Sequence, residues 1–244
     1  MLRIWEAGLA GSQATRAVRM LSAAGHTDAD ADADGGVETL SIGRRDALVL
    51  GLRIRLFGPR AEAVVSCPAC AEELEIGFDA TTLQADAPQP PAELEASAAG
   101  HTVRFRLPHT GDLRAVATFG GGTDDLAAAR AALLARCVRE AWDASGAEVP
   151  ADALPAEVTA AVATVMELAD PQAVVSVAVT CPCCGHAWTA PFDAVEFLWH
   201  ELDMAAQRLL ADVHRLATAY GWSEREILAM GPARRDRYLG MVHQ

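Results

Sequence analysis

Apolar positions in the first sixty residues recur at helical spacing. A helix is predicted over about residues 13–24, ending at Gly25, and the acidic stretch HTDADADADGG that follows is predicted to form a polar loop. A second, amphipathic helix is predicted to begin near Arg44. Its apolar positions are Ala47, Leu48, Leu52, Ile54 and Leu56.

The pattern then changes to strand alternation on both sides of a Cys-Pro-Ala-Cys sequence. Val64 and Val65 precede it, and Leu74, Ile76 and Phe78 alternate with polar residues after it. This predicts a hairpin with the cysteines at its tip. The stretch VVSVAVTCPCCGHAWTAPFDA predicts a second hairpin of the same kind.

Between the two hairpins the pattern is mixed. Residues 83–100 are rich in Pro and Ala and are predicted to be a linker or exposed loop, and HTVRFRLP is predicted to be a strand. A helix is predicted over about residues 124–142, and another from Pro155 to about Ala169. The inward face of the first of these helices is expected to hold Leu126, Leu133, Leu134, Cys137 and Val138.

The C-terminal region is predicted to be helical. Its long helix carries one apolar stripe and ends at Gly221, and Ser223 with Glu226 forms a capping box for a short helix. Gly231 and Pro232 precede a last helix. The stripe contains Leu198, Leu202, Ala205, Leu209, Val213, Leu216 and Tyr220.

Charge and hydropathy exclude several classes of function. The formal net charge of −13 and the pI of about 4.9 argue against general nucleic-acid binding, because phosphate binding depends on clustered basic residues. No apolar run has the roughly 20 residues of a membrane helix, and the N-terminal residues lack a signal-peptide pattern. A cytoplasmic, non-membrane protein is expected.

The strongest feature of the sequence is an internal repeat around two cysteine pairs. A shift of 114 residues lays CPACAEELEIGFDA at Cys67 over CPCCGHAWTAPFDA at Cys181. Cys70 then matches Cys184, and the Phe-Asp-Ala ending recurs. Because the chain shows no secretion signal, its six cysteines indicate metal or redox chemistry rather than a disulfide framework.

Two Cys-x-x-Cys pairs fit one structural zinc ion. Tetrahedral zinc takes four thiolates, and each hairpin tip supplies two, so Cys67, Cys70, Cys181 and Cys184 are the predicted ligands. The two hairpins are expected to pack side by side about a pseudo-twofold axis. A thioredoxin-like dithiol is disfavoured, because a strand pattern and not a helix follows each pair. Catalytic zinc is disfavoured because it needs an open fourth position.

The other candidate ligands are secondary. Cys137 is expected to be a buried small apolar residue, whereas Cys183 and His186 remain competitors for a place at the metal. His200 and His214 lie on the long helix without the spacing of a metalloprotease motif, and receive no catalytic role.

These elements predict an α+β fold. Two zinc-knuckle β-hairpins form a zinc ribbon and pack with several α-helices and a helical C-terminal region. The predicted regions are 1–62 (N-terminal helices), 63–118 (first hairpin and a β segment), 119–172 (helical insertion), 173–194 (second hairpin) and 195–244 (C-terminal helices).

Several segments together resemble a known family. They are SIGRRDALVLGLRIRLFGPRAEAVVSCPAC, FRLPHTGDL, CPCCGHAWTAPFDAVEFLWHEL and LATAYGWSEREILAMGPARRDRYL. Their sequence is similar to the T-even-phage-type baseplate proteins of contractile phage tails and bacterial contractile injection systems. The resemblance implies a protein that is built into such a baseplate or assists its assembly, with protein partners and no small-molecule substrate.

Three functions are therefore compared. The first is a non-catalytic baseplate component or assembly factor with one structural Zn²⁺. The second is a zinc-ribbon regulator that binds nucleic acid or the transcription machinery, which Glu72, Glu73 and Glu75 beside the first knuckle disfavour. The third is a dithiol oxidoreductase.

The C-terminal helices are the expected partner-binding element. They carry Trp199, Trp222 and Tyr238 as well as Arg234, Arg235 and Arg237, and aromatic residues and arginine are the residues that anchor protein interfaces. In the alternative, the apolar stripe packs on the helix near residues 124–142, the aromatics complete the core, and the arginines form a solvated helix face.

Overall fold

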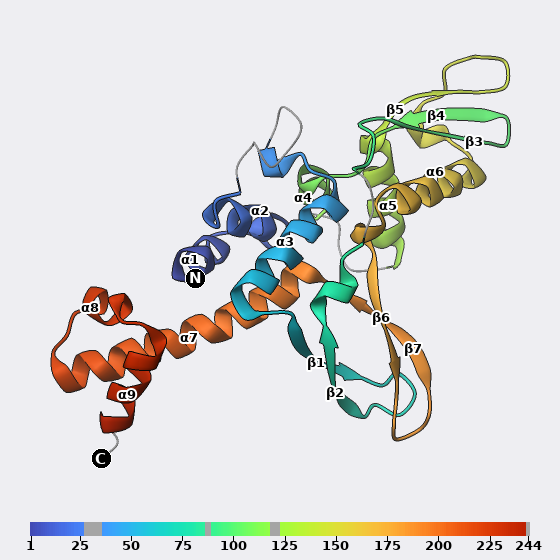
Figure 1. The fold of residues 1–244 in the computed structure, drawn as a ribbon. Coiled ribbons are helices and arrows are strands. Elements are labelled where there is room, and N and C mark those ends of the chain that lie inside the picture. The colour runs from blue at the N-terminus through green and yellow to red at the C-terminus, as the bar shows by residue number, and fades with distance from the viewer. Residues whose placement is uncertain (27–35, 86–88, 118–122, 243–244) are drawn as a thin grey trace.

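The computed structural model describes residues 1–26, 36–85, 89–117 and 123–242, so most of the predicted acidic loop lies outside the described chain. The fold is α+β, with a helical body, two long hairpins and a helical C-terminal region from residue 205 onwards, called the head (Figure 1). The helices are α1 (Leu2–Leu9), α2 (Gln13–Ala23), α3 (Ile42–Phe57), α4 (Thr110–Val116), α5 (Thr123–Cys137), α6 (Ala156–Ala169), α7 (Ala194–Tyr220), α8 (Glu224–Ala229) and α9 (Pro232–Val242). Short 3-10 turns are η2 (Gly36–Glu38), η3 (Ala80–Leu83), η4 (Ala151–Ala153) and η5 (Pro171–Ala173). The strands are β1 (Arg60–Ser66), β2 (Glu73–Asp79), β3 (Leu94–Ala98), β4 (His101–Phe105), β5 (Val138–Trp142), β6 (Val175–Thr180) and β7 (Ala187–Phe192).

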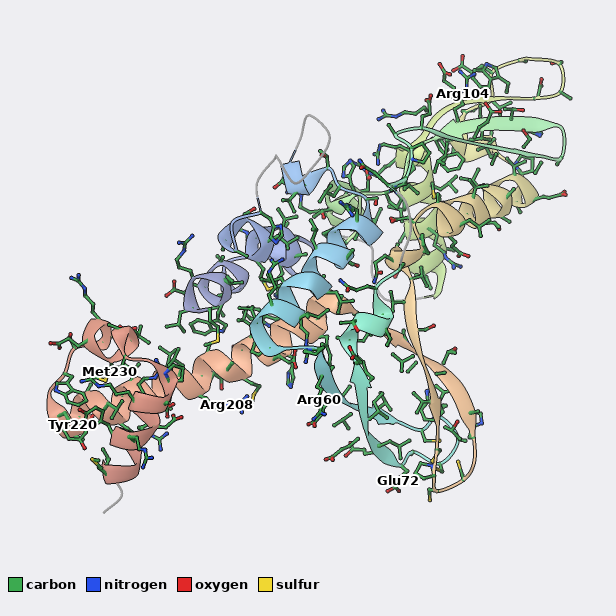
Figure 2. All side chains as sticks on the ribbon, in the orientation of Figure 1. Arg60, Glu72, Arg104, Arg208, Tyr220 and Met230 are labelled. Carbon is green, nitrogen blue, oxygen red and sulfur yellow. The ribbon has the colours of Figure 1, made fainter. Side chains whose placement is uncertain are left out.

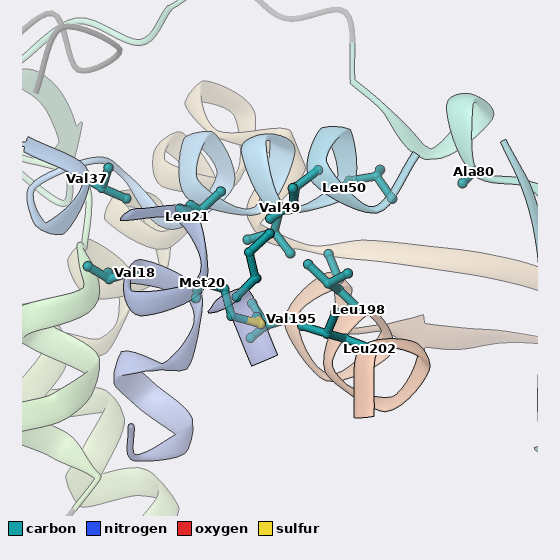
Figure 3. Close-up of a cluster of buried hydrophobic side chains, with 14 of the residues drawn as sticks. Val18, Met20, Leu21, Val37, Val49, Leu50, Ala80, Val195, Leu198 and Leu202 are labelled. Atoms are coloured by element: carbon teal, nitrogen blue, oxygen red, sulfur yellow. The ribbon is translucent and has the colours of Figure 1, made fainter. Parts of the chain in front are cut away.

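The body is built around α3, which packs on α2 and on the first half of α7. The Ser41 side chain accepts a hydrogen bond from the Arg44 amide and so caps α3, and Gly58, at a φ of 85°, ends it. The helix predicted near Arg44 is thereby confirmed. Figure 3 shows the buried side chains where these helices meet, among them Met20, Leu21, Val49, Leu50, Leu198 and Leu202.

A buried arginine joins α3 to the root of the first hairpin. Arg53 is only 2% exposed, and its guanidinium makes two 2.7 Å hydrogen bonds to the carboxylate of Glu201 on α7. It also donates to the carbonyls of Gly58 and Arg60, at 2.6 and 2.7 Å. Because all four contacts are charge-assisted and the Arg53 side chain itself is buried, Arg53 fixes where β1 leaves the body.

A separate three-stranded sheet, in the order β3-β4-β5, packs on α6. It corrects two predictions. The second half of the predicted 83–100 loop is strand β3, which turns into β4 through Ala99 and Gly100, both at positive φ. Two of the alanines that suggested a linker, Ala96 and Ala98, alternate with polar residues along β3.

The helix predicted over residues 124–142 ends at Cys137. Residues 138–142 form β5, which pairs with β4. Hydrogen bonding to the edge of β4 therefore outweighs the helical propensity of these residues. Leu126, expected to face inward, is 60% exposed, whereas Cys137 is buried as expected. The helix predicted from Pro155 is confirmed as α6.

A fully buried carboxylate ties this sheet to α4 and α5. Asp112 accepts hydrogen bonds from Arg106, from Arg136 and from the backbone amide of His109, while the His109 ring caps α4 in return. Burial alone would raise the pKa of Asp112. The hydrogen bonds from Arg106 and from the amide of His109, together with the charge of Arg106, outweigh burial and bring the pKa down to about 2.

The segment between α6 and β6 fastens the second hairpin beside the first. The carboxylate of Asp170 accepts a hydrogen bond from the Gly43 amide in the first turn of α3, at 2.8 Å. The Gln172 side chain accepts a hydrogen bond from the amide of Ala85 and donates one to the carbonyl of Leu83, the last residue of η3. Two short polar side chains therefore set the spacing of the hairpin roots.

The long C-terminal helix is confirmed, as are its left-handed cap at Gly221 and the capping box of Ser223 with Glu226. The apolar stripe is buried at both ends of α7. Leu198 and Leu202 join the body core, and Val213 and Leu216 join a small core with α8 and α9. Among the described residues neither core contains one from α5, so the alternative in which the stripe packs on that helix is wrong.

Among the residues that the structure describes, no helix combines the length and the apolar character that crossing a membrane requires.

Candidate metal centre

The two cysteine hairpins share one register. Ser66 pairs with Glu73 at the end of the first hairpin, and Thr180 pairs with Ala187 at the end of the second. These pairs differ by the same 114 residues as the sequence repeat. The hairpins predicted around both cysteine pairs are therefore confirmed, and their strands deliver each pair to the tip in an equivalent position.

Each tip is closed by the same two backbone hydrogen bonds. The amide of Cys67 donates to Glu72 and the amide of Cys181 to His186, at 2.9 and 2.8 Å. Within each turn, the amides of Ala71 and Gly185 donate back to the carbonyl of the first cysteine, both at 2.9 Å. Ala71 and Gly185 are themselves equivalent, and both have a left-handed backbone, with φ of 59° and 73°.

The repeat continues past the strands and then diverges. Asp79 accepts a hydrogen bond from the Thr81 amide and caps the short turn η3, whereas the equivalent Asp193 caps α7 through the amides of Val195 and Glu196. The first hairpin therefore returns the chain to the body after one turn. The second starts the 27-residue helix that ends in the head.

The hairpins meet through their apolar faces. Cys67, Leu74, Val179, Cys181 and Ala190 form a small buried cluster, flanked by Val65, Ile76, Val177 and Trp188. Apolar side chains on alternate positions of all four strands thus point into one seam. This seam holds the two tips together.

The structure brings together the sulfurs of Cys67, Cys70, Cys181 and Cys184, which all lie within 4.8 Å of one another. The Cys67 and Cys184 sulfurs are 3.7 Å apart, as are those of Cys70 and Cys181. A zinc ion with four sulfurs at about 2.3 Å has S–S edges of about 3.8 Å, so the cluster has the size of a four-thiolate zinc tetrahedron. All six cysteines are free of disulfide bonds.

The electrostatics of the cluster suit a cation. Burial raises the pKa of the Cys67 thiol, but the amides of Ala69 and Cys70 donate to its sulfur and bring the pKa down to about 7. The Glu72 amide lowers the pKa of Cys70. The neighbouring sulfurs and burial together outweigh this effect and raise the pKa to about 12. Four crowded thiols therefore resist full ionisation unless a positive charge lies among them.

The other candidate residues stay outside the sulfur cluster. Cys183 is exposed at the tip, and the His186 ring stacks on Trp188 with centroids 5.9 Å apart. Cys137 lies at the end of α5, where burial raises the pKa of its thiol to about 11. Each cysteine pair is followed by a return strand, so neither thiol pair stands at a helix N-terminus as a thioredoxin-like dithiol does.

Sequence reasoning missed the buried polar residues that position the hairpins. Arg53, Asp170 and Gln172 could not be recognised, because nothing in the local pattern marks a polar side chain as buried. Arg53 and Asp112 do lie within two of the segments that carry the family resemblance, but that resemblance does not indicate that their side chains are buried.

A comparison with protein-family models matches residues 23–199 of this chain to the T4 bacteriophage base plate protein family. The chain belongs to this family. The match to the T4 baseplate family spans both hairpins and all four clustered cysteines, and ends within α7, so the head lies beyond it. Searches of curated proteins and of solved structures gave no match.

Proposed function

We propose that this protein is a non-catalytic structural or assembly component of a baseplate, in a contractile phage tail or a related injection system, and that it acts in the cytoplasm. The observation that carries the proposal is the family match over residues 23–199, which encloses the four-cysteine cluster. Its partners are other baseplate proteins. It needs no small-molecule substrate.

One Zn²⁺ ion bound by Cys67, Cys70, Cys181 and Cys184 is the proposed cofactor. The sulfur spacing and the equivalent backbone turns support a closed structural site, because all four tetrahedral positions are filled by protein. The ion's role is to join two hairpins that leave the body at separate points. It thereby makes one rigid projection out of two marginal two-stranded sheets.

The alternative, a zinc-ribbon regulator that binds nucleic acid, has weaker support. The outer face of the first hairpin carries Glu62, Glu73 and Glu75, all exposed. The second hairpin has no charged residue between Pro171 and Phe192. Arg60, at the start of β1, is the one arginine or lysine in the four hairpin strands, and a single cation is too few for the clustered contacts that phosphate binding requires.

Co-purification from cells that express a complete injection-system gene cluster tests the proposal. The wild-type protein should co-elute with baseplate or tail components and carry one zinc per chain by elemental analysis. Cys67→Ser and Cys184→Ser should lose the metal and the co-elution, because three thiolates hold zinc poorly and the hairpins separate.

Cys183→Ser is the matched control, since this exposed cysteine neighbours a proposed ligand and should leave both readouts unchanged. Wild-type protein with no zinc or with two ions per chain would refute the metal site. Normal tail assembly after deletion of the gene would refute the baseplate role.

A further inference from the structure

The head carries a cluster of aromatic rings at its surface. Tyr220, 38% exposed, stacks on Trp222 with ring centroids 4.5 Å apart, and Tyr238 meets Trp222 edge-on at 4.8 Å. The guanidinium of Arg234 lies 5.7 Å from the Tyr238 ring. We call these four residues with Arg237 the head surface. Stacked rings beside exposed arginines are the usual anchors of protein interfaces.

The head is basic within an acidic protein. Residues 205–244 hold six arginines and four carboxylates, whereas residues 1–204 hold 14 arginines and 29 carboxylates. Arg225, Arg234, Arg235 and Arg237 form no ion pair with any described residue of the chain, and three of them are exposed. Four neighbouring cations without such pairs in the described chain favour an acidic counterpart.

A groove of complementary character lies on the body. It has a volume of about 660 Å³ and runs between the first hairpin and α7. Val64, which is 64% exposed, and Phe197 supply apolar side chains to its lining, which also includes Glu62 and Glu75. Neither glutamate is paired with a cation among the described residues. The groove thus offers apolar surface beside negative charge.

The head surface cannot reach the groove of its own chain. Both are attached to α7, which is one continuous helix, and Figure 2 shows Tyr220 at the far end of α7 from the hairpins. A rigid helix holds its two ends apart. The complementary surfaces can meet only between two molecules.

We propose that the head surface of one copy of this chain binds the acidic groove of a second copy. The aromatic rings cover Val64 and Phe197, while Arg234 and Arg237 pair with Glu62 and Glu75. Because the two surfaces differ, the contact is heterologous and generates a ring or an open chain of subunits. The acidic body disfavours nucleic acid as the occupant of the head.

Charge reversal on each side tests the contact directly, by sedimentation or light scattering of the purified zinc-loaded protein. Wild type should self-associate at about 50 mM salt and dissociate at about 500 mM, since screening weakens exposed pairs. Arg234→Glu with Arg237→Glu, and separately Glu62→Arg with Glu75→Arg, should each weaken self-association at least about tenfold. An equimolar mixture of the two variants should associate again, because each then meets an oppositely charged surface.

The control is Arg130→Glu with Arg139→Glu, which changes the net charge as Arg234→Glu with Arg237→Glu does. Both control sites are exposed and lie away from the two surfaces, so association should be unchanged. Val64→Ser should weaken it without altering charge. The proposal is overturned if wild type stays monomeric at low salt, if the mixture fails to associate, or if the control weakens association equally. It is also overturned if an oligo-dT strand, and not a second copy, binds the head. A monomeric result would leave the proposed baseplate role standing, because the test involves no baseplate component.

Discussion

At the scale of single residues, each cysteine knuckle depends on one backbone position in the left-handed region. The second knuckle places Gly185 there, whereas the first places Ala71, whose Cβ makes this conformation unfavourable. The two knuckles therefore have equivalent hydrogen bonds but differ in the conformational energy of this one residue. The first knuckle carries strain that the second lacks.

Exchanging these residues should change stability in opposite directions. Ala71→Gly should stabilise the protein by about 1 kcal/mol, and Gly185→Ala should destabilise it by a similar amount, because only glycine adopts this φ without a steric cost. Denaturant titration of the zinc-loaded protein measures both. Ala69→Gly, in the same turn but without a positive φ, should give no gain. Equal effects of Ala69→Gly and Ala71→Gly would contradict the role assigned to backbone strain.

The cysteine cluster could be predicted at this scale because it rests on a repeat, and a repeat is visible in one sequence. A second copy of the Cys-Pro-x-Cys tip specified both the partner hairpin and the four sulfurs that meet. Arg53 and Asp170 could not be predicted, since burial of a charge depends on elements that are distant in the sequence. Only the folded chain shows which polar groups their side chains satisfy.

At the scale of elements, the contact between α3, β1 and α7 depends on Arg53. Arg53→Met should destabilise the protein by about 3 to 5 kcal/mol, because it leaves the Glu201 carboxylate and two carbonyls without their buried donor. Thermal or denaturant unfolding measures the loss. Arg55→Met, on an exposed turn of the same helix, should cost less than about 0.5 kcal/mol. If the two substitutions cost the same, Arg53 does not fix the hairpin root.

The joint between the three-stranded sheet and helices α4 and α5 should depend on pH. The pKa of Asp112 is lowered to about 2 in the folded protein, so its ionised form contributes stability above its unfolded value of 3.8 and loses it as the pH falls towards 2. The cost of Asp112→Asn should thus shrink by about 2 kcal/mol between about pH 6 and pH 2.

Glu167→Gln, at an exposed position of α6, is the control for this change, and its effect should not vary with pH in the same window. Unfolding of each variant beside wild type at matched pH gives the difference. A constant cost of Asp112→Asn across the window would show that the ionised carboxylate contributes nothing.

Elements were predicted well wherever their own residues decide them. Helices α3, α7 and α8 and both cysteine hairpins fall in this group, because caps and alternation are local. Helix α4 was missed although it has a capping box. Strands β3 and β5 were missed for the opposite reason. Ala-rich β3 and the last five residues of the predicted 124–142 helix become strands only because β4 lies between them and pairs with both.

At the scale of the whole molecule, the apolar clusters are separate. In the part of the chain that the structure describes, the body core and the hairpin seam share no residue, and the head has a core of its own around Leu216 and Ile227. Such separate clusters can open separately, since each stabilises mainly its own elements. The proposed zinc ion should therefore matter most to the hairpins.

Removing zinc with a chelator should loosen the hairpins before the body. Backbone amides in residues 60–79 and 175–192 should exchange with solvent much faster, while those of α2, α3 and the first half of α7 should keep their protection. Hydrogen exchange with mass spectrometry resolves the two regions. Simultaneous loss of protection in the hairpins and the body would show that the ion supports the whole fold.

Because α7 is continuous, it also fixes the direction in which the head faces around the helix axis. An α-helix turns by about 100° and rises by about 1.5 Å per residue, so one residue inserted between Asp203 and Arg208 would swing every group on the head a quarter-turn or more around the helix axis. Seven inserted residues would restore the original phase to within about 20° while moving the head outward by about 10 Å. Length changes in this stretch thus act on the head's direction far more than on its distance, and in steps set by the helical repeat.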